Sequence, residues 1–414
     1  MLSECWPEYA IIIFVTALRP AFVGCGHELR DNHPPQPACW PPLTFAPPMS
    51  TTPSRTGPLP NLNLQALQAS AAIADAKGRL LPDQIRLIQD SDWLRMLAPQ
   101  ALGGGELPLP EVVRLEEAIS AMDGSCGWVV TLCAGAGWFT GFLPPALGQQ
   151  IMATPHVCLA GSGAPTGFAD REGEGWRLNG RWTHASGSQI ATHFTLNAQL
   201  REGGQALLNA QGLPRVQAFV VPASDVRVEP DSWHSIGLRA STSCAFSLQD
   251  VRVSAEHAFV IDTAHATAPG PLYRFPFMAL AFVTLGACVL GMARHFVALA
   301  EPFVQRHIPF LDGPSQASQA LWHSSHQALQ ASRSGFYAAL DQTWLTVQQG
   351  APMDSGAETR LVNTTQALVR QCREIVDALY PCCGLQAADP RTEINRVWRD
   401  FHTASQHALW LRQP

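Results

Sequence analysis

The last part of the chain carries the side chains best suited to chemistry, in a segment with helical spacing. Within residues 393–410, Trp398, His402 and Ser405 fall on one face of a helix. His407 follows roughly two helical turns after an arginine–aspartate pair. An imidazole changes its charge near neutral pH, so it can hold or move a proton. We therefore predict a closing helix over a site whose other wall lies in the middle of the chain.

Two interpretations of this segment stay open at this point. His407 is either a site residue or a surface histidine near a helix end, where the helix dipole favours a cation. His402 is the second candidate histidine. It lies more than one turn from His407, so the two need not share a pocket. We expect Arg399 and Asp400 to be structural and to tie the closing helix to its bundle.

A second group of candidates lies between residues 182 and 241. Ser186 and Gly187 form a predicted turn whose backbone N–H groups can face a ligand, although turns favour these residue types anyway. Trp182 can pack on a flat ligand, but a strand tryptophan usually belongs to the core. Arg239 can bind a phosphate, or a carboxylate in an ordinary structural ion pair. Ser241 follows it in the same segment.

The totals exclude several classes of function. The chain has 414 residues and a formal net charge of −6, which gives no reason to expect binding to nucleic acid or to an anionic membrane. Its eleven cysteines are scattered and include no C-x-x-C pair. This pattern argues against a metal site and a disulfide framework, and it indicates a reducing, cytoplasmic location.

The first 60 residues differ in composition from the rest. The apolar stretch at residues 10–18 is too short to span a bilayer, and its flank is acidic, unlike that of a signal peptide. A proline-rich run follows. We interpret residues 1–60 as an extension that is disordered or not translated, with Met49 as the hypothetical true start.

The periodicity of the remaining chain changes twice. Residues 61–155 predict an all-α domain, residues 156–262 a β domain of the barrel or sandwich type, and residues 270–414 a four-helix bundle. Within the β domain, Asn179–Gly180 predicts the turn of a hairpin. The fold class is therefore α+β. The four long helices are expected at residues 277–307, 315–349, 359–380 and 391–410.

Four motifs, in order over residues 62–410, resemble the acyl-CoA dehydrogenase superfamily. They are WLRMLAPQALGG at 93–104, GWRLNGRWTHASG at 175–187, DSWHSIGLRAST at 231–242 and NRVWRD at 395–400. The resemblance implies an N-terminal helical domain, a middle β-barrel and a C-terminal four-helix bundle. It also implies a flavoprotein that assembles as a homotetramer.

The sequence departs from the true dehydrogenases at two places. Their catalytic glutamate stands where this chain has Ala408, which cannot abstract a proton. Their glycine-rich segment, which holds the adenine half of FAD, corresponds to residues 379–385, which contain one glycine. The "Ala-Ser-Gly" after Trp182 resembles instead the monooxygenase branch, in which a separate reductase supplies reduced FMN or FAD.

Roles follow from this resemblance. His407 and Ser186 are the expected catalytic residues, with His407 supporting the oxygen adduct of the flavin or deprotonating the substrate. The expected flavin contacts are Trp182, Ser186, Gly187, Arg239 and Ser241.

The favoured function is a two-component flavin monooxygenase acting on a small hydrophobic substrate, aromatic or sulfur-containing. Two alternatives stay open. One is an acyl-CoA dehydrogenase whose base has moved, for example to Glu116 or Glu117. The other is a flavin-binding homologue without catalysis.

Overall fold

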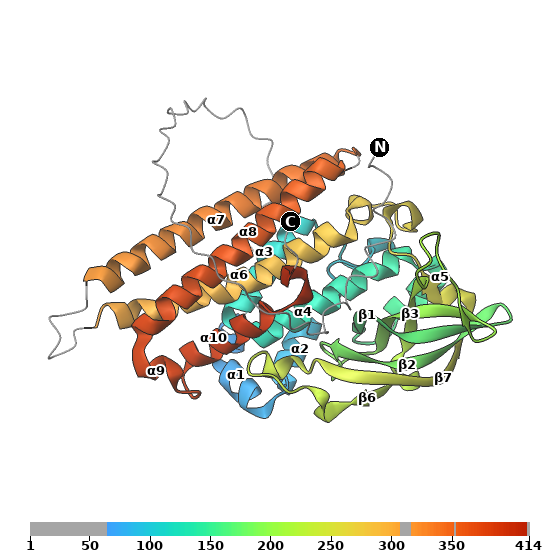
Figure 1. Cartoon of the computed structure of the whole chain (residues 1–414), viewed down its shortest axis with the longest axis horizontal. Helices are drawn as coiled ribbons and strands as arrows, with labels where there is room; N and C mark the ends of the chain where they lie inside the picture. Colours follow the sequence, from blue (N-terminus) through green and yellow to red (C-terminus); the bar gives the residue numbers. More distant parts are fainter. Residues whose placement is uncertain (1–63, 307–315, 352, 412–414) are drawn as a thin grey trace, which may run out of the picture. The chain divides into compact units, whose positions relative to one another are not determined.

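The computed structural model describes residues 64–306, 316–351 and 353–411. The predicted extension at residues 1–60 lies outside the described residues. The described chain runs from helices through a sheet to longer helices (Figure 1). It is a mixed α+β fold, as predicted.

Five α-helices precede the sheet in the described part of the chain. They are α1 (Leu64–Lys77), α2 (Pro82–Asp90), α3 (Leu109–Met122), α4 (Gly124–Trp138) and α5 (Pro145–Met152). Asp123 separates α3 from α4. Its carboxylate caps α4 by accepting a hydrogen bond from the N–H of Cys126 at 3.1 Å. Almost all of α4 is buried, because it lies between the helices and the sheet.

One mixed sheet of eight strands follows. The strands are β1 (Leu159–Glu172), β2 (Gly175–Ala185), β3 (His193–Glu202), β4 (Gln205–Ala206), β5 (Val216–Pro222), β6 (Arg227–Glu229), β7 (Cys244–Val253) and β8 (Ala258–Phe259). Their order is β6-β7-β2-β1-β3-β5-β8, with β4 beside β3. The predicted barrel is not closed in the described part of the chain. Its end strands, β6 and β8, are only three and two residues long and do not pair with each other there.

The predicted hairpin at Asn179–Gly180 is wrong. These residues lie inside β2, where the pairing with β7 shifts register between Leu178 and Gly180. A glycine in a strand interior often marks such a bulge. The chain reverses earlier, at residues 173–174, between β1 and β2.

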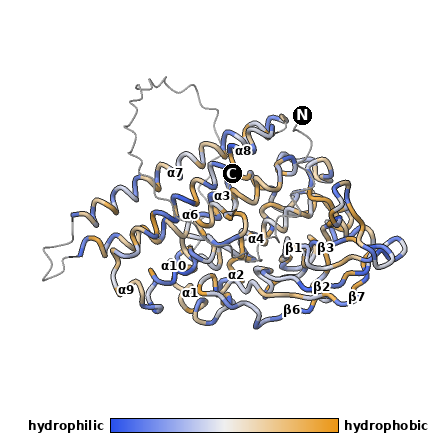
Figure 2. The backbone as a smooth tube through the Cα atoms, in the orientation of Figure 1, coloured by the Kyte–Doolittle hydropathy of each residue, from blue (hydrophilic) through white to orange (hydrophobic). Residues whose placement is uncertain are grey.

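The C-terminal helices include the four long ones that the periodicity predicted. They are α6 (Phe277–Val304), α7 (Gln316–Gln348), α8 (Ser355–Leu379), the short α9 (Gly384–Ala388) and α10 (Glu393–Ala404). In Figure 2, hydrophilic and hydrophobic residues alternate along α7 and α8. Helix α6 is apolar and long enough to cross a membrane. However, 78% of its most apolar window is buried in the protein, where it packs against α3 and α8. This is the burial expected of a core helix.

The closing helix is shorter than predicted. Helix α10 ends at Ala404, and a separate 3₁₀ turn follows at Ala408–Leu411. His407 therefore lies in the connection between the two, where its ring direction is set by a turn and not by helical spacing.

Candidate active site

Ser186 stands at the end of β2, with its hydroxyl turned inward. The indole N–H of Trp128, on α4, donates to Ser186 Oγ at 3.1 Å. Ser186 Oγ also lies 2.7 Å from Ser243 Oγ. The carbonyl of Ser186 accepts a bond from the Cys133 thiol at 3.5 Å. Both faces of the Ser186 turn are thus fixed by buried groups of α4 and of the segment before β7.

The direction of this hydroxyl chain follows from proton counting. Ser241 Oγ donates to the carbonyl of Leu238 at 2.7 Å and lies 2.8 Å from Ser243 Oγ. Each hydroxyl has one proton. Ser241 has used its own, so Ser243 donates to Ser241 and Ser186 donates to Ser243. Ser186 Oγ then accepts from Trp128 and keeps one lone pair for another donor.

Gly187 fills a position that a side chain cannot occupy. Its φ is +76°, and an added Cβ would lie 2.6 Å from Cys133 Sγ. Its N–H donates to the carbonyl of Ser241 at 2.9 Å. Gly187 therefore places Ser186 by local backbone geometry. Its predicted contact with a flavin stays a prediction.

His407 meets the same group from the other side. Its ring lies 5.8 Å from the ring of Trp128, centroid to centroid, in an edge-to-face arrangement. Burial, and to a lesser degree the charge of His184, lowers the pKa of His407 to about 4. The imidazole is therefore neutral at neutral pH. Its Nδ1 accepts from the N–H of Leu409 at 3.4 Å, which leaves the proton on Nε2. The structure thus brings His407 and Ser186 to the same indole.

His184 lies near the candidate site, although the sequence did not single it out. Its backbone is left-handed, with φ +66°, and its ring meets Trp233 edge-on at 6.0 Å. Burial lowers the pKa of His184 as well. A histidine with left-handed backbone gives no pattern in the sequence, and Trp128 and Ser243 looked like ordinary helix and strand residues.

Two predicted flavin contacts, Trp182 and Ser241, are surrounded by protein side chains, and their contact with a flavin stays a prediction. Trp182 is fully buried in the core of the sheet, stacked on Phe246 at 5.3 Å, and its indole N–H donates to the carbonyl of Asn197 at 2.8 Å. This is the packing role that the sequence left open. Ser241 is also fully buried, within the hydroxyl chain.

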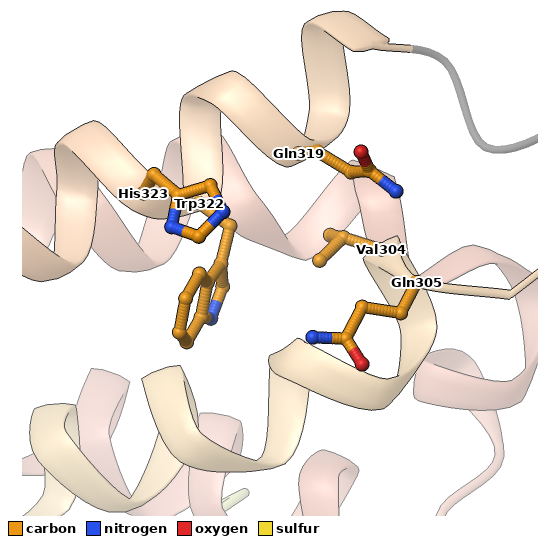
Figure 3. A pocket seen from close by; sticks show the side chains of 5 residues that line it. All are labelled: Val304, Gln305, Gln319, Trp322 and His323. Atoms are coloured by element: carbon orange, nitrogen blue, oxygen red, sulfur yellow. The ribbon is translucent and has the colours of Figure 1, made fainter.

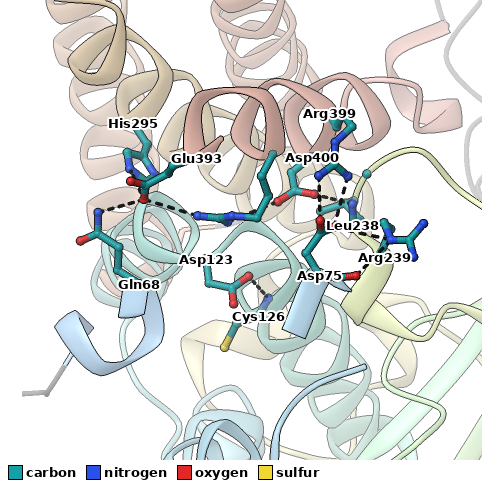
Figure 4. Close-up of polar contacts among 12 residues, drawn as sticks. Gln68, Asp75, Asp123, Cys126, Leu238, Arg239, His295, Glu393, Arg399 and Asp400 are labelled. Carbon is teal, nitrogen blue, oxygen red and sulfur yellow. Dashed lines mark hydrogen bonds and ion pairs between the residues drawn. The ribbon is translucent and has the colours of Figure 1, made fainter. Parts of the chain in front are cut away.

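The closing helix is anchored beside the site by its arginine–aspartate pair (Figure 4). Arg399 binds both carboxylate oxygens of Asp75, on α1, at 3.2 and 2.7 Å. The Asp400 carboxylate accepts from the N–H of Leu238 at 2.6 Å. At Gly237 the loop passes so close to α10 that an added Cβ would lie 2.0 Å from the carbonyl oxygen of Arg399.

The predicted tie from Arg399 and Asp400 to the bundle is therefore wrong. The pair joins α10 to α1 and to the loop before β7. Contacts with the bundle come from other residues. Glu393 lies 3.3 Å from His295 on α6, and His402 lies 3.3 Å from Asp377 on α8. His402 is thus turned toward α8, away from the partners of His407.

Two surface hollows differ in their relation to this site. One, of about 300 Å³, lies between the ends of α6 and α7 and is lined by Trp322 and His323 (Figure 3). It contains none of the predicted site residues. The other, of about 250 Å³, is lined by Arg239 and by Trp233, which contacts His184.

Comparison with known proteins sets these residues in a family. The family model described as "Acyl-CoA dehydrogenase, C-terminal domain" matches residues 283–411. A pigment production hydroxylase from Rhodococcus sp. is 32% identical over 80% of this chain and 86% of its own length. The chain belongs to the flavin-dependent monooxygenases of the acyl-CoA dehydrogenase superfamily. This is the family that the sequence motifs indicated.

Other relatives of this monooxygenase agree. An indole-3-acetate monooxygenase from Pseudomonas putida is 24% identical over 81% of this chain and 85% of its own length. Among solved structures, a 3-HSA hydroxylase from Rhodococcus sp. aligns over 84% of this chain and 90% of its own, with a TM-score of 0.77 and 19% identity. That structural likeness shows the fold.

The dehydrogenase alternative is set aside, since the chain is a flavin-dependent oxidoreductase of the monooxygenase type. The glutamates offered as a relocated base agree with this. Glu117 is bound by Arg294, by Arg333 at 2.7 Å and by the Tyr337 hydroxyl. Glu116 is fully buried, and neither carboxylate oxygen has a hydrogen-bond partner within the described ranges.

Proposed function

We propose that this monooxygenase is the oxygenase component of a two-component system, which takes reduced flavin from a separate reductase and hydroxylates a small aromatic compound. The names of relatives support both the two-component system and the aromatic substrate. A Rhizobium relative is called "FADH(2)-dependent resorcinol hydroxylase, oxygenase component", and a Rhodococcus jostii relative is an "oxygenase subunit". We propose FAD as the flavin and a homotetramer as the assembly.

The observation that carries this proposal is the meeting of Ser186 and His407 at the indole of Trp128. A reduced flavin carries one N–H donor on its central ring, at N5, and activates dioxygen when bound. The free lone pair of Ser186 Oγ suits such a donor. Trp128 and Ser243 hold that oxygen in place at 3.1 and 2.7 Å, so little is lost in ordering it.

His407 has a distinct role in this proposal. Because its imidazole is neutral and its Nδ1 faces the backbone of Leu409, its proton lies on Nε2. Of the two roles considered for His407, hydrogen-bond donation is favoured over deprotonation of the substrate. Trp128 and the turn after α10 cover Ser186 and His407 and help exclude water. Water in the site would waste reducing equivalents as hydrogen peroxide.

Replacement of His407 tests the proposal. In an assay with a flavin reductase, NADH and a panel of phenols, His407→Asn should lower product formation by about 100-fold and divert the reducing equivalents to hydrogen peroxide. His402→Asn is the matched control, because His402 lies five residues before His407, in the last turn of α10, and faces Asp377. An equal loss of product in both variants, or no loss in either, would count against the role assigned to His407.

A further inference from the structure

The hollow beside the site has a charged wall of its own. It is formed by the end of α1, the loop after β6 and the turn that begins at Arg239. Its volume of about 250 Å³ can hold a small acidic group, but it is below the usual range for a whole drug-sized ligand. Gly78, Trp233 and Arg239 are among the residues that line it.

Arg239 brings positive charge that its neighbours do not balance. Its Nε donates to the backbone carbonyl of Asp75 at 3.0 Å and lies 3.8 Å from the Asp75 carboxylate. That carboxylate is already bound through both oxygens by Arg399 (Figure 4). One carboxylate thus faces two guanidinium groups.

The outer part of Arg239 is available for a ligand. Its side chain is 46% exposed, and its two terminal nitrogens have no hydrogen-bond partner among the described residues. Lys77 and Arg79 flank the lining residue Gly78 and are exposed. Within the described ranges neither makes an ion pair. A forked guanidinium in such surroundings is suited to a carboxylate or phosphate.

The hollow is connected to the proposed site through aromatic rings. Trp233 lines the hollow and is held by its indole N–H, which donates to the carbonyl of Leu238 at 3.0 Å. Its ring meets that of His184 at 6.0 Å. The charge of His184 in turn adds to the effect of burial in lowering the pKa of His407. An acidic group in the hollow would thus lie one residue layer away from the group around His407.

We infer that this hollow binds an anionic oxygen group, and that the group is the carboxylate of an aromatic acid substrate. The inference rests on the proposed function for the identity of the substrate, while the anion site itself rests on Arg239 and its surroundings. The name of the indole-3-acetate relatives, whose substrate is an aromatic carboxylate, supports it. The same chemistry would also fit a phosphate of the flavin, which the experiment separates.

The test measures binding to the full chain without turnover, by quenching of tryptophan fluorescence. The probes are phenylacetate, its neutral amide, FMN and riboflavin, which lacks the phosphate. Arg239→Gln should weaken phenylacetate binding by about 10- to 100-fold and leave the amide within about 2-fold. Arg239→Lys should bind phenylacetate with an affinity between those of the wild type and Arg239→Gln. In both variants the ratio of FMN to riboflavin affinity should stay unchanged.

The control and the remaining outcomes decide the source of the anion. Arg252→Gln removes an exposed arginine paired with Glu172 on the sheet, so it should change no ratio. A changed FMN-to-riboflavin ratio with an unchanged acid-to-amide ratio would assign the site to the flavin phosphate and overturn the carboxylate. Unchanged ratios in correctly folded Arg239→Gln would overturn the anion site. Because no product is measured, failure of hydroxylation would not affect these results.

Discussion

At the scale of single residues, the least expected feature is a carboxyl group buried without a partner. Glu116 on α3 is fully buried, and burial raises its pKa well above the ordinary glutamate value of 4.5. The folded protein therefore holds the Glu116 proton up to a higher pH than the unfolded chain, which loses it near the ordinary value of 4.5. As the pH rises above this value, the unfolded state gains stability relative to the folded one. Because of Glu116, the free energy of unfolding is thus lower at neutral pH than at mildly acid pH.

Replacing Glu116 by a neutral side chain of similar length should remove this dependence. We expect Glu116→Met to be more stable than the wild type by about 1–3 kcal/mol at about pH 8, and by less at about pH 5. Urea unfolding at both pH values measures the difference. Glu111→Gln is the control, since Glu111 is exposed in the first turn of the same helix. A pH slope that is identical in wild type and Glu116→Met would contradict the assignment.

At the scale of elements, the site depends on how closely the loop before β7 approaches α10. Gly237→Ala would place a Cβ 2.0 Å from the carbonyl oxygen of Arg399 and 2.5 Å from the N–H nitrogen of Asp400. The loop would have to move, and with it Leu238 and the hydroxyl chain that ends at its carbonyl. We expect a loss of about 1–3 kcal/mol in unfolding free energy and weaker flavin binding, measured by urea unfolding and flavin titration.

A control for this substitution lies in α4. An added Cβ at Gly135 meets no atom within 4 Å, and alanine favours helices over glycine. Gly135→Ala should therefore preserve flavin binding and keep or slightly raise stability. If Gly237→Ala behaved like Gly135→Ala, close contact between loop and helix would not be what positions the site.

The elements also show what sequence reasoning can reach. Helical spacing correctly predicted the long helices, because an amphipathic face repeats with the helical period. It failed at the end of α10. The 3₁₀ turn at Ala408–Leu411 still buries Leu409, so the apolar spacing continues after the helix has ended. The hairpin predicted at Asn179–Gly180 was wrong for a related reason, since the same pair of residues suits either a turn or a β-bulge.

The candidate site could be predicted only in part. Ser186 stands in a motif and His407 follows seven residues after one, and the structure places both beside Trp128. The sequence did not indicate the partners that fix them, because Trp128 and Ser243 come from segments that only the tertiary fold brings together. His184 was missed because a left-handed backbone at a histidine cannot be read from residue types.

At the scale of the whole molecule, the proposed function makes the chain one part of a reaction that needs a second protein. The proposed oxygenase has to receive its flavin already reduced, and then protect it from water between the α4 side of the site and the turn after α10. The origin of the product oxygen distinguishes the proposed monooxygenase from the alternatives, because a dehydrogenase or a non-catalytic homologue would insert none.

The most direct measurement uses oxygen-18 gas. The protein is supplied with reduced FAD by a separate reductase and given an aromatic substrate, and the product is analysed by mass spectrometry. We expect one oxygen-18 atom in each molecule of hydroxylated product, and more of this product than the reductase forms without the chain. Product that is unlabelled, or formed equally without the chain, would contradict the proposed function.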